Sequence, residues 1–235
     1  MLDARRAIWL EESRVLAVAD LHLGYAWAHR LSGQMLPLSA REDSLERLLS
    51  LVADYRPLEL LVLGDIVHKA VPVEALEAEL RSLCAEVTRH TTLRLIAGNH
   101  DKGLALLLRQ CGIEAKLLSA HDAGPHLLLH GDEKDDAAAE LHFSNIRARG
   151  GRIVMGHEHP AIHVGDGIAS IKCPCFLVSA DLVILPAFSQ WAAGASVRTG
   201  DFLSALARAA RFDTAYAIMG RRLLPIELSA RRRGR

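Results

Sequence analysis

Long apolar runs are missing from this sequence. None of its hydrophobic stretches approaches the roughly 18 residues that a membrane-spanning helix needs. Charges interrupt the apolar residues of the N-terminal segment, where a signal peptide would have its apolar core. Cysteine is also scarce, with four residues at irregular spacing that do not indicate a disulfide framework. These absences argue against a membrane protein and a disulfide-rich secreted domain, and we expect a cytoplasmic protein without a membrane partner.

A net charge of either sign is missing as well. The 28 basic residues balance the 28 acidic residues, and several arginines lie at the very end of the chain, so the rest of it is slightly acidic. Bulk charge therefore does not indicate nucleic-acid binding. We expect the basic segment 230–235 to be a solvated, frayed terminus, with phosphate contacts as the alternative.

What the sequence contains is typical of a globular protein, because 50% of the residues are hydrophobic and 24% are charged. There is no internal repeat, low-complexity stretch or linker rich in Pro, Gly or Ser. A chain of this length can bury a substantial core. We therefore expect residues 1–235 to form a single domain.

Short apolar runs that end abruptly in polar residues recur along the chain. Runs of this length with little alternation are typical of strands buried on both faces. The five runs that end in this way are 15–20, 58–65, 93–101, 126–132 and 152–160. Three further segments in the C-terminal third favour strands joined by turns, and these are 171–178, 182–188 and 215–228.

Helical patterns lie between the early strands. The four segments expected to be helical are 45–52, 76–87, 103–110 and 135–149. Ser39 with Glu42 forms a capping box ahead of the first helix, and Pro72 suits the first turn of the second. Asp135 or Asp136 is expected to cap the fourth. Strands that alternate with helices, followed by a mostly β ending, predict an α/β fold of layered sheets with helices outside.

Each of the five apolar runs ends in residues that can bind metal ions. These residues are Asp20 and His22, Asp65 after Gly64, Asn99, His100 and Asp101 after Gly98, His130 before Gly131, and His157 and His159 after Gly156. Ligands of open α/β sheets gather outside the carboxyl ends of the strands, so we expect these side chains to converge on one crevice. The glycines leave room for tight turns beside a ligand.

The spacing of these residues indicates how ions would be held. Side chains two residues apart on an extended segment point the same way, so Asp20 and His22 are expected to bind one ion together. His157 and His159 are expected to do likewise, or to reach two neighbouring ions. Asp65 is the natural candidate for a carboxylate that bridges two ions. Mixed imidazole and carboxylate ligands suit Zn, Mn or Fe better than Ca or Mg alone.

Together, the D-x-H, G-D, G-N-H-D, H-G and G-H-x-H motifs resemble those of the calcineurin-like metallophosphoesterase superfamily over residues 15–160. The resemblance implies a four-layer α/β/β/α sandwich with two divalent metal ions between the loops of its sheets. It assigns the first ion to Asp20, His22 and His159, the bridge to Asp65, and the second ion to Asn99, His130 and His157. It also places His100 over the metals, oriented by Asp101.

Within the superfamily, the chain is most similar to a prokaryotic group that includes the ligase-associated DNA-damage-response endonucleases. The stretches A-D-L-H-L-G-Y (19–25) and G-D-I-V-H (64–68) support this similarity. It implies DNA as the substrate, and it allows a repair ligase or helicase as a partner and a homo-oligomer. The Ser/Thr protein phosphatases carry G-D-x-V-D-R-G where this chain has His68 and Lys69, and the missing arginine argues against phosphoprotein monoesters as substrates.

The chemistry that this site would support is the hydrolysis of phosphodiesters. Two metal ions, expected to be Mn with Zn or Fe as alternatives, would neutralise the phosphate and activate a water. His100 is the candidate general acid for the leaving alkoxide. Asp101 is expected to set the tautomer of His100 and to stabilise its imidazolium form. A turn-capping carboxylate is its other interpretation, and both roles could hold at once.

Residues near the motifs have more than one interpretation. His68 would contact substrate or support a metal ligand, or else be a surface histidine. Trp27, His29 and Arg30 follow the first motif without clear periodicity. They would form a lid that stacks a base or binds phosphate, or else a packed tryptophan and a solvated arginine.

The favoured function is a dinuclear-metal-dependent phosphodiesterase that acts as a nuclease in DNA repair. A small-molecule phosphoesterase for nucleotides or cyclic nucleotides is the alternative, and the near-neutral charge favours it. A metal-bound scaffold without turnover is a third interpretation, which the complete ligand set and the presence of His100 argue against. Only the closer family resemblance favours the nuclease.

Overall fold

The computed structural model describes residues 1–34, 40–70, 73–165, 169–192 and 194–228. Ser39, Pro72 and the arginine-rich end fall outside the described residues, and so does the side chain of Glu42. The capping box, the proline turn and the frayed tail therefore stay predictions. Within the described parts of the chain, no helix is both long and apolar enough to cross a bilayer.

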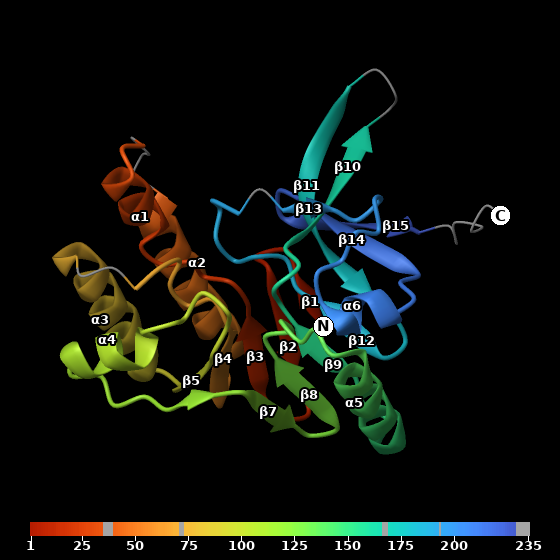
Figure 1. Ribbon diagram of the computed structural model, residues 1–235, viewed down its shortest axis with the longest axis horizontal. Coiled ribbons are helices and arrows are strands. Elements are labelled where there is room, and N and C mark those ends of the chain that lie inside the picture. The colour runs from red at the N-terminus through yellow and green to blue at the C-terminus, as the bar shows by residue number, and fades with distance from the viewer. Residues whose placement is uncertain (35–39, 71–72, 166–168, 193, 229–235) are drawn as a thin grey trace.

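The first sheet has six strands in the order β1-β2-β3-β4-β5-β6. Its strands are β1 (Leu2–Asp3), β2 (Ala7–Leu10), β3 (Val15–Val18), β4 (Glu59–Leu63), β5 (Thr92–Ile96) and β6 (Leu117–Leu118). Strands β3 to β6 run parallel, whereas β1 to β3 are antiparallel. The helices that connect the parallel strands are α1 (Tyr25–Leu31), α2 (Ala40–Tyr55), α3 (Glu74–Thr88) and α4 (Leu104–Gln110). They all lie on one side of the pair of sheets (Figure 1).

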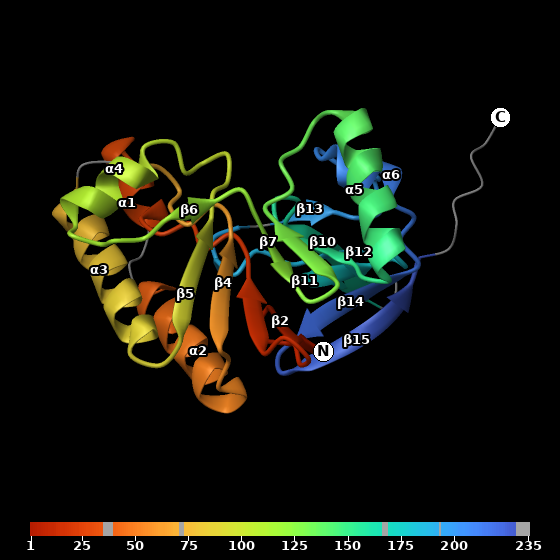
Figure 2. The ribbon, with the colours of Figure 1, turned by 90° about the horizontal axis from the view of Figure 1, so that it is seen from below.

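The second sheet has nine strands, with β14 pairing both β11 and β15 beside the path β13-β10-β11-β12-β9-β8-β7. Its strands are β7 (Ala120–Ala123), β8 (His126–Leu129), β9 (Ile153–Met155), β10 (Pro160–Gly165), β11 (Ser170–Val178), β12 (Leu182–Ile184), β13 (Ala195–Ser196), β14 (Thr214–Met219) and β15 (Arg222–Glu227). Two helices, α5 (Asp136–Arg149) and α6 (Ala205–Ala209), cover its outer face (Figure 2). The mostly β ending that the sequence predicts is confirmed.

Three apolar clusters separate these layers. In β4, Leu60 and Val62 pack with the helices of the first sheet, whereas Leu61 and Leu63 face the second sheet, whose Phe176 lies in the same inner cluster. Both faces of the strand are thus buried, which explains its uninterrupted apolar run. A third cluster lies between the second sheet and α5 and α6. The order of layers is α/β/β/α, as the family resemblance implies.

The helices agree with prediction except in two places. Asp135 caps α5 by accepting a hydrogen bond from the amide of Ala137 (2.9 Å). Residues 25–31, which show no clear periodicity, nevertheless form α1, whose one buried residue is Ala26. Helix α6 was not predicted either, because five residues are too short to show a period of 3.6.

Candidate metal centre

The loops that follow five strands meet at one edge of the two sheets. The strands end earlier than the apolar runs suggest, so the predicted ligands lie just beyond β3, β4, β5, β8 and β9. The parallel strands of each sheet end at a common edge, which brings their following loops together. The structure therefore brings together the loops that carry the predicted ligands.

One group of side chains lies around Asp20. The ligand atoms of Asp20, His22, Asp65 and His159 all lie within 4.8 Å of one another. The Nε2 atoms of His22 and His159 are 3.3 Å apart, and His159 Nε2 is 3.5 Å from Asp20 Oδ1. Asp20 is fully buried and Asp65 is 2% exposed. These are the residues expected at the first ion, together with the expected bridge.

A second group lies around His130. Its Nε2 atom is 3.5 Å from Asp65 Oδ1, 3.1 Å from Asn99 Oδ1 and 3.2 Å from His157 Nδ1. The other ring nitrogen, Nδ1, lies 3.0 Å from the carbonyl oxygen of Leu63, which can only accept a hydrogen bond. In the neutral ring, Nδ1 therefore carries the proton and Nε2 carries a lone pair. This lone pair faces the Asp65 and Asn99 oxygens and the His157 nitrogen. Asp65 is the residue that the two groups share.

The atoms of both groups that could coordinate a metal ion suit divalent cations. Two pairs of imidazole nitrogens face each other at 3.2 and 3.3 Å, and His130 Nε2 also faces two oxygen acceptors. Lone pairs that face one another without protons repel, and a cation between them removes the repulsion. Imidazole and carboxylate ligands together suit Mn, Zn or Fe. The residues present therefore fit two metal ions.

Protonation favours the same conclusion. Burial lowers the pKa of His22 to about 3 and, with the neighbouring His130, that of His157 to about 4, so both rings are neutral at neutral pH, as metal binding by imidazole requires. Burial acts to raise the pKa of Asp20, but its hydrogen bond and charge interaction with His159 outweigh it and hold this pKa below the usual value. Burial raises the pKa of Asp65 despite the nearby His130. A bridging cation would favour the ionised form of this carboxylate.

The backbone of the centre differs from the extended geometry that the sequence led us to expect. Eight non-glycine residues among those described have positive φ, and five of them are predicted metal ligands. These five are Asp20 (57°), His22 (48°), Asp65 (48°), His157 (68°) and His159 (44°). The side chains of each D-x-H or H-x-H pair do meet at the centre, but left-handed turns bring them there. The expectation that these side chains meet because they alternate along an extended strand was therefore wrong.

Two glycines are needed for close approach, as predicted. A Cβ atom on Gly64, whose φ is 77°, would collide with the ring of His130. A Cβ atom on Gly98 would collide with the backbone nitrogen and Oδ1 of Asp65. Any larger side chain at either position would push apart two residues of the centre.

The partner of His100 is not the one expected. The Nδ1–H of His100 donates to the carbonyl oxygen of His68 (2.9 Å), while the ring is exposed above the centre. The Asp101 carboxylate accepts hydrogen bonds from the amides of Gly98 (2.8 Å) and Val67 (3.1 Å). Burial raises the pKa of Asp101 to about 6 despite these two bonds. The expected orientation of His100 by Asp101 is corrected: Asp101 ties together the loops after β4 and β5, which is its turn-capping alternative.

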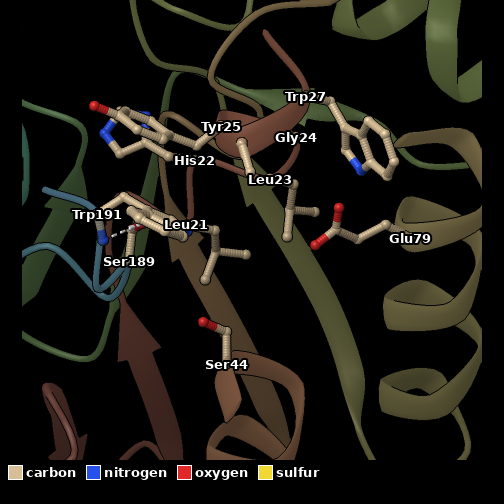
Figure 3. Close-up of a pocket in the computed structure, with 11 residues that line it drawn as sticks. Leu21, His22, Leu23, Gly24, Tyr25, Trp27, Ser44, Glu79, Ser189 and Trp191 are labelled. Atoms are coloured by element: carbon tan, nitrogen blue, oxygen red, sulfur yellow. Dashed lines mark hydrogen bonds between the residues drawn. The ribbon is translucent and has the colours of Figure 1, made fainter. Parts of the chain in front are cut away.

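The structure places His68 near the centre and Trp27 away from it. His68 lies beside the centre, because the ligand atoms of His22, His68 and His100 are within 4.8 Å of one another. Arg30 lies over the ring of Trp27, with its guanidinium carbon 5.6 Å from the ring centroid. Figure 3 shows Trp27 on the Glu79 side of a small pocket, away from His22. Substrate binding by Arg30 stays a prediction.

Three residues at the centre had no role in the sequence prediction. Tyr25 packs on His68, with ring centroids 4.5 Å apart, and Trp191 stacks on Tyr25. Glu158 is buried between two predicted ligands and accepts hydrogen bonds from the amides of Leu203 and Ser204. Glu158 is the x residue of the G-H-x-H motif, and this position could have indicated from the sequence that it lies at the centre. Nothing local marks Trp191, which lies more than 160 positions from Tyr25 in the chain.

Comparisons with known proteins agree with this geometry. A search of curated proteins finds no match. The crystal structure of the Pseudomonas putida nuclease MPE superposes with a TM-score of 0.67 and covers 96% of this chain and 94% of its own, at 24% sequence identity, which shows a shared fold. Residues 13–184 match the family model of calcineurin-like phosphoesterases. Because this match spans well over half of the sequence, the chain belongs to the calcineurin-like phosphoesterase family, whose chemistry is the hydrolysis of phosphoester bonds with divalent metal ions.

Proposed function

We propose that this protein is a dinuclear-metal-dependent phosphodiesterase and that its natural substrate is nucleic acid. The observation that carries the proposal is the pair of donor groups joined by Asp65. Asp20, His22 and His159 would hold one ion, and a second group would hold the other: Asn99, His130 and His157. Residues 1–235 are taken as one domain. Manganese is the proposed metal, with zinc or iron as alternatives.

Bound metal ions would neutralise the phosphate and supply an activated water. The residues of the chain then have separate tasks. The buried carboxylates and the imidazoles hold fixed positions, because the backbone and the His130–Leu63 hydrogen bond restrain them. His100, exposed above the centre, is positioned to protonate the departing alkoxide from Nε2, while the His68 carbonyl holds its Nδ1–H.

The choice of nucleic acid rests on two supports. The similar Pseudomonas putida protein is described as a nuclease. The motifs beyond the metal ligands also resemble those of DNA-repair endonucleases, which makes a repair role part of the proposal. The near-neutral charge of the chain favours the alternative, a phosphoesterase for nucleotides or cyclic nucleotides. Partners such as a ligase or helicase, a homo-oligomer and a cytoplasmic location remain proposals.

An activity panel on the purified chain tests this function. The substrates are bis- and mono-p-nitrophenyl phosphate, single-stranded DNA, plasmid DNA and cyclic nucleotides, each with Mn, Zn, Mg or a chelator. We expect Mn-dependent hydrolysis of the diester and of DNA, and slower hydrolysis of the monoester, because the cationic groups that suit a dianion are missing. Faster turnover of the monoester would refute the diester assignment. Turnover of cyclic nucleotides without DNA cleavage would establish the alternative.

A matched pair of variants links the activity to the centre. Asp20→Ala removes a fully buried carboxylate from the first donor group. Asp201→Ala removes an exposed carboxylate elsewhere on the chain. Activity that belongs to this site is lost in the first variant and unchanged in the second.

A further inference from the structure

Six flat rings form a continuous cluster that begins at the metal centre. They are His22, His100, His68, Tyr25, His29 and Trp191, and they come from segments far apart in the sequence. We propose that the outer end of this cluster, the Trp191–Tyr25 pair, is a stacking site for the nucleobase next to the phosphodiester that is cleaved. This inference rests on the proposed function and names the part of the substrate that the chain would recognise.

The cluster connects the candidate general acid to the stacked pair. The rings of His100 and His68 lie nearly parallel, at an angle of 27° with centroids 5.3 Å apart. His68 contacts Tyr25 at 4.5 Å, and Tyr25 is nearly parallel to Trp191 (7°, 5.9 Å). Two ring contacts therefore connect His100 to Tyr25, a third connects Tyr25 to Trp191, and a base on this pair would lie at the outer end of that series.

Backbone hydrogen bonds fix both members of the pair relative to the metal centre. The amide of Tyr25 donates to the carbonyl of His22 (3.1 Å). In the segment that leads to Trp191, the amide of Ser189 donates to the carbonyl of Asp20 (3.1 Å). The amide of Trp191 itself donates to Ser189 Oγ (3.3 Å). The stacking surface is thus held in place before substrate arrives, which lowers the entropy cost of binding.

The shape of the site indicates where the base would lie. A pocket of about 60 Å³ separates Tyr25 and Trp191 from Trp27 (Figure 3), and it is far too small for a nucleobase. Tyr25 and Trp191 are both half-buried, so each residue keeps part of its surface in contact with solvent. The base would lie against the exposed part of Trp191. Its partners would be π faces with no base-specific hydrogen bond, so we expect recognition of any unstacked base and preference for single strands.

The same rings have a structural explanation, because they also pack α1 against the loops of the sheet. The two explanations predict different losses. If the pair only supports the fold, its disruption weakens binding to every anion alike. If the pair stacks a base, its disruption weakens binding only where a base is present.

Fluorescence anisotropy with two labelled probes tests the proposal. One probe is a short oligothymidylate and the other is an abasic sugar-phosphate strand of the same length and charge, both with Ca²⁺ in place of Mn²⁺. We expect the wild-type chain to bind oligothymidylate more tightly by about fivefold to 100-fold, the usual contribution of one stacked base. Trp191→Leu should abolish this preference and leave the affinity for the abasic strand unchanged. Trp191→Phe, which keeps a flat ring, should restore most of it.

The control is the second tryptophan–tyrosine pair of the chain. Trp9 stacks on Tyr55 (5.3 Å, 28°) and is likewise half-buried, but it lies on β2 of the first sheet. Trp9→Leu should leave the preference unchanged. The proposal is overturned if the wild-type chain shows no preference for oligothymidylate, or if Trp191→Leu weakens binding of both probes equally.

Failure of this proposal can be told apart from failure of the proposed function. Hydrolysis of bis-p-nitrophenyl phosphate with Mn²⁺, together with equal binding of the two probes, leaves a phosphodiesterase without a base-stacking site. A preference for oligothymidylate that depends on Trp191, without hydrolysis of any diester, leaves a nucleic-acid-binding site and refutes the phosphodiesterase.

Discussion

Individual residues of the metal centre adopt backbone conformations that their types seldom adopt. A left-handed conformation costs a non-glycine residue about 1–3 kcal/mol, and it persists only where the surroundings hold it. Hydrogen bonds do so here, since the amide of His22 donates to the carbonyl of Asp65 (2.8 Å) and that of Asp20 to Gly64 (3.2 Å). The amide of His157 in turn donates to Asp20 Oδ2 (3.1 Å). The proposed ligands therefore restrain one another even through their backbones.

Asp65 is expected to matter more for metal content than any other ligand. Asp65→Ala removes the one side chain that the two donor groups share, so both ions should be lost. Metal analysis of the purified variant by mass spectrometry, beside wild type and Asp201→Ala, measures this. Full occupancy in Asp65→Ala would show that another residue bridges the ions.

His100 is expected to act on the leaving group and not on the metals. His100→Asn should keep both ions and the fold, while hydrolysis of DNA or a dialkyl diester falls by about 10²–10⁴-fold, the usual contribution of general acid catalysis. p-Nitrophenolate is stable as an anion, so bis-p-nitrophenyl phosphate should lose much less. Steady-state kinetics on both substrates measures the difference. Equal losses would indicate that His100 positions the phosphate, and loss of metal would make it a ligand.

Asp101 serves as a comparison for His100. Its carboxylate bonds to backbone amides of two loops. Asp101→Asn should therefore lower activity on both kinds of substrate by similar factors, together with a fall in the urea midpoint. Leaving-group dependence like that of His100→Asn would restore the predicted role of Asp101 as the residue that orients His100.

Among the elements, the short helix α6 connects two of the loops that carry proposed metal ligands. Glu158 Oε1 accepts from the amide of Ser204 at the start of α6 (2.7 Å), and Oε2 accepts from Leu203 (3.2 Å). The amide of Ala205 donates to the carbonyl of Glu133, in the loop that follows His130. Helix α6 therefore holds the loop of His130 and the loop of the two H-x-H ligands in fixed relation.

Glu158→Gln is expected to disturb this connection. The two amides bond to different oxygens of Glu158, so in the Gln variant one of them would face an NH₂ group that cannot accept, which should cost about 1–3 kcal/mol. Metal affinity should fall by about tenfold as the histidine loop loses support. Urea unfolding and metal titration measure these effects. Glu140→Gln, at an exposed position on α5, is the matched control, and equal results for the two variants would contradict the role of Glu158.

For the molecule as a whole, the candidate metal centre lies where the edges of both sheets meet. Asp20, Asp65 and Asn99 follow strands of the first sheet, whereas His130 and His157 follow strands of the second. Apolar side chains hold the sheets together below the centre, with Phe176 and Leu61 fully buried between them. Metal ions bound at this edge would add links between the sheets that the apolar interface does not provide.

Metal binding should therefore raise the thermal stability of the whole chain. At a metal concentration about 100 times Kd the gain is about 2.7 kcal/mol, which for a protein of this size raises Tm by about 5–10 °C. Thermal unfolding of the metal-free chain with and without Mn²⁺ measures this shift, and excess chelator should reverse it. An equal shift in Asp65→Ala would place the stabilising metal elsewhere.

The sequence by itself indicated which residues could form the centre and that sheets would lie inside with helices outside. Asp20, Asp65 and His130 could be identified because a ligand type directly after a buried apolar run is a local pattern. Helices α2 to α5 could also be identified from a local pattern, because burial of one helix face places apolar residues at a period of 3.6. Their arrangement as α/β/β/α followed from the motif set that these residues form.

Only the tertiary structure decided how these residues meet. The left-handed turns at Asp20 and His159, the His68 carbonyl as the partner of His100, and the contact of Trp191 with Tyr25 all depend on loops from distant parts of the chain. Such contacts form when the two sheets pack and bring their edges together. Local pattern carries no information about them, because a residue's neighbours across the sheet interface are set by packing and not by its place in the sequence.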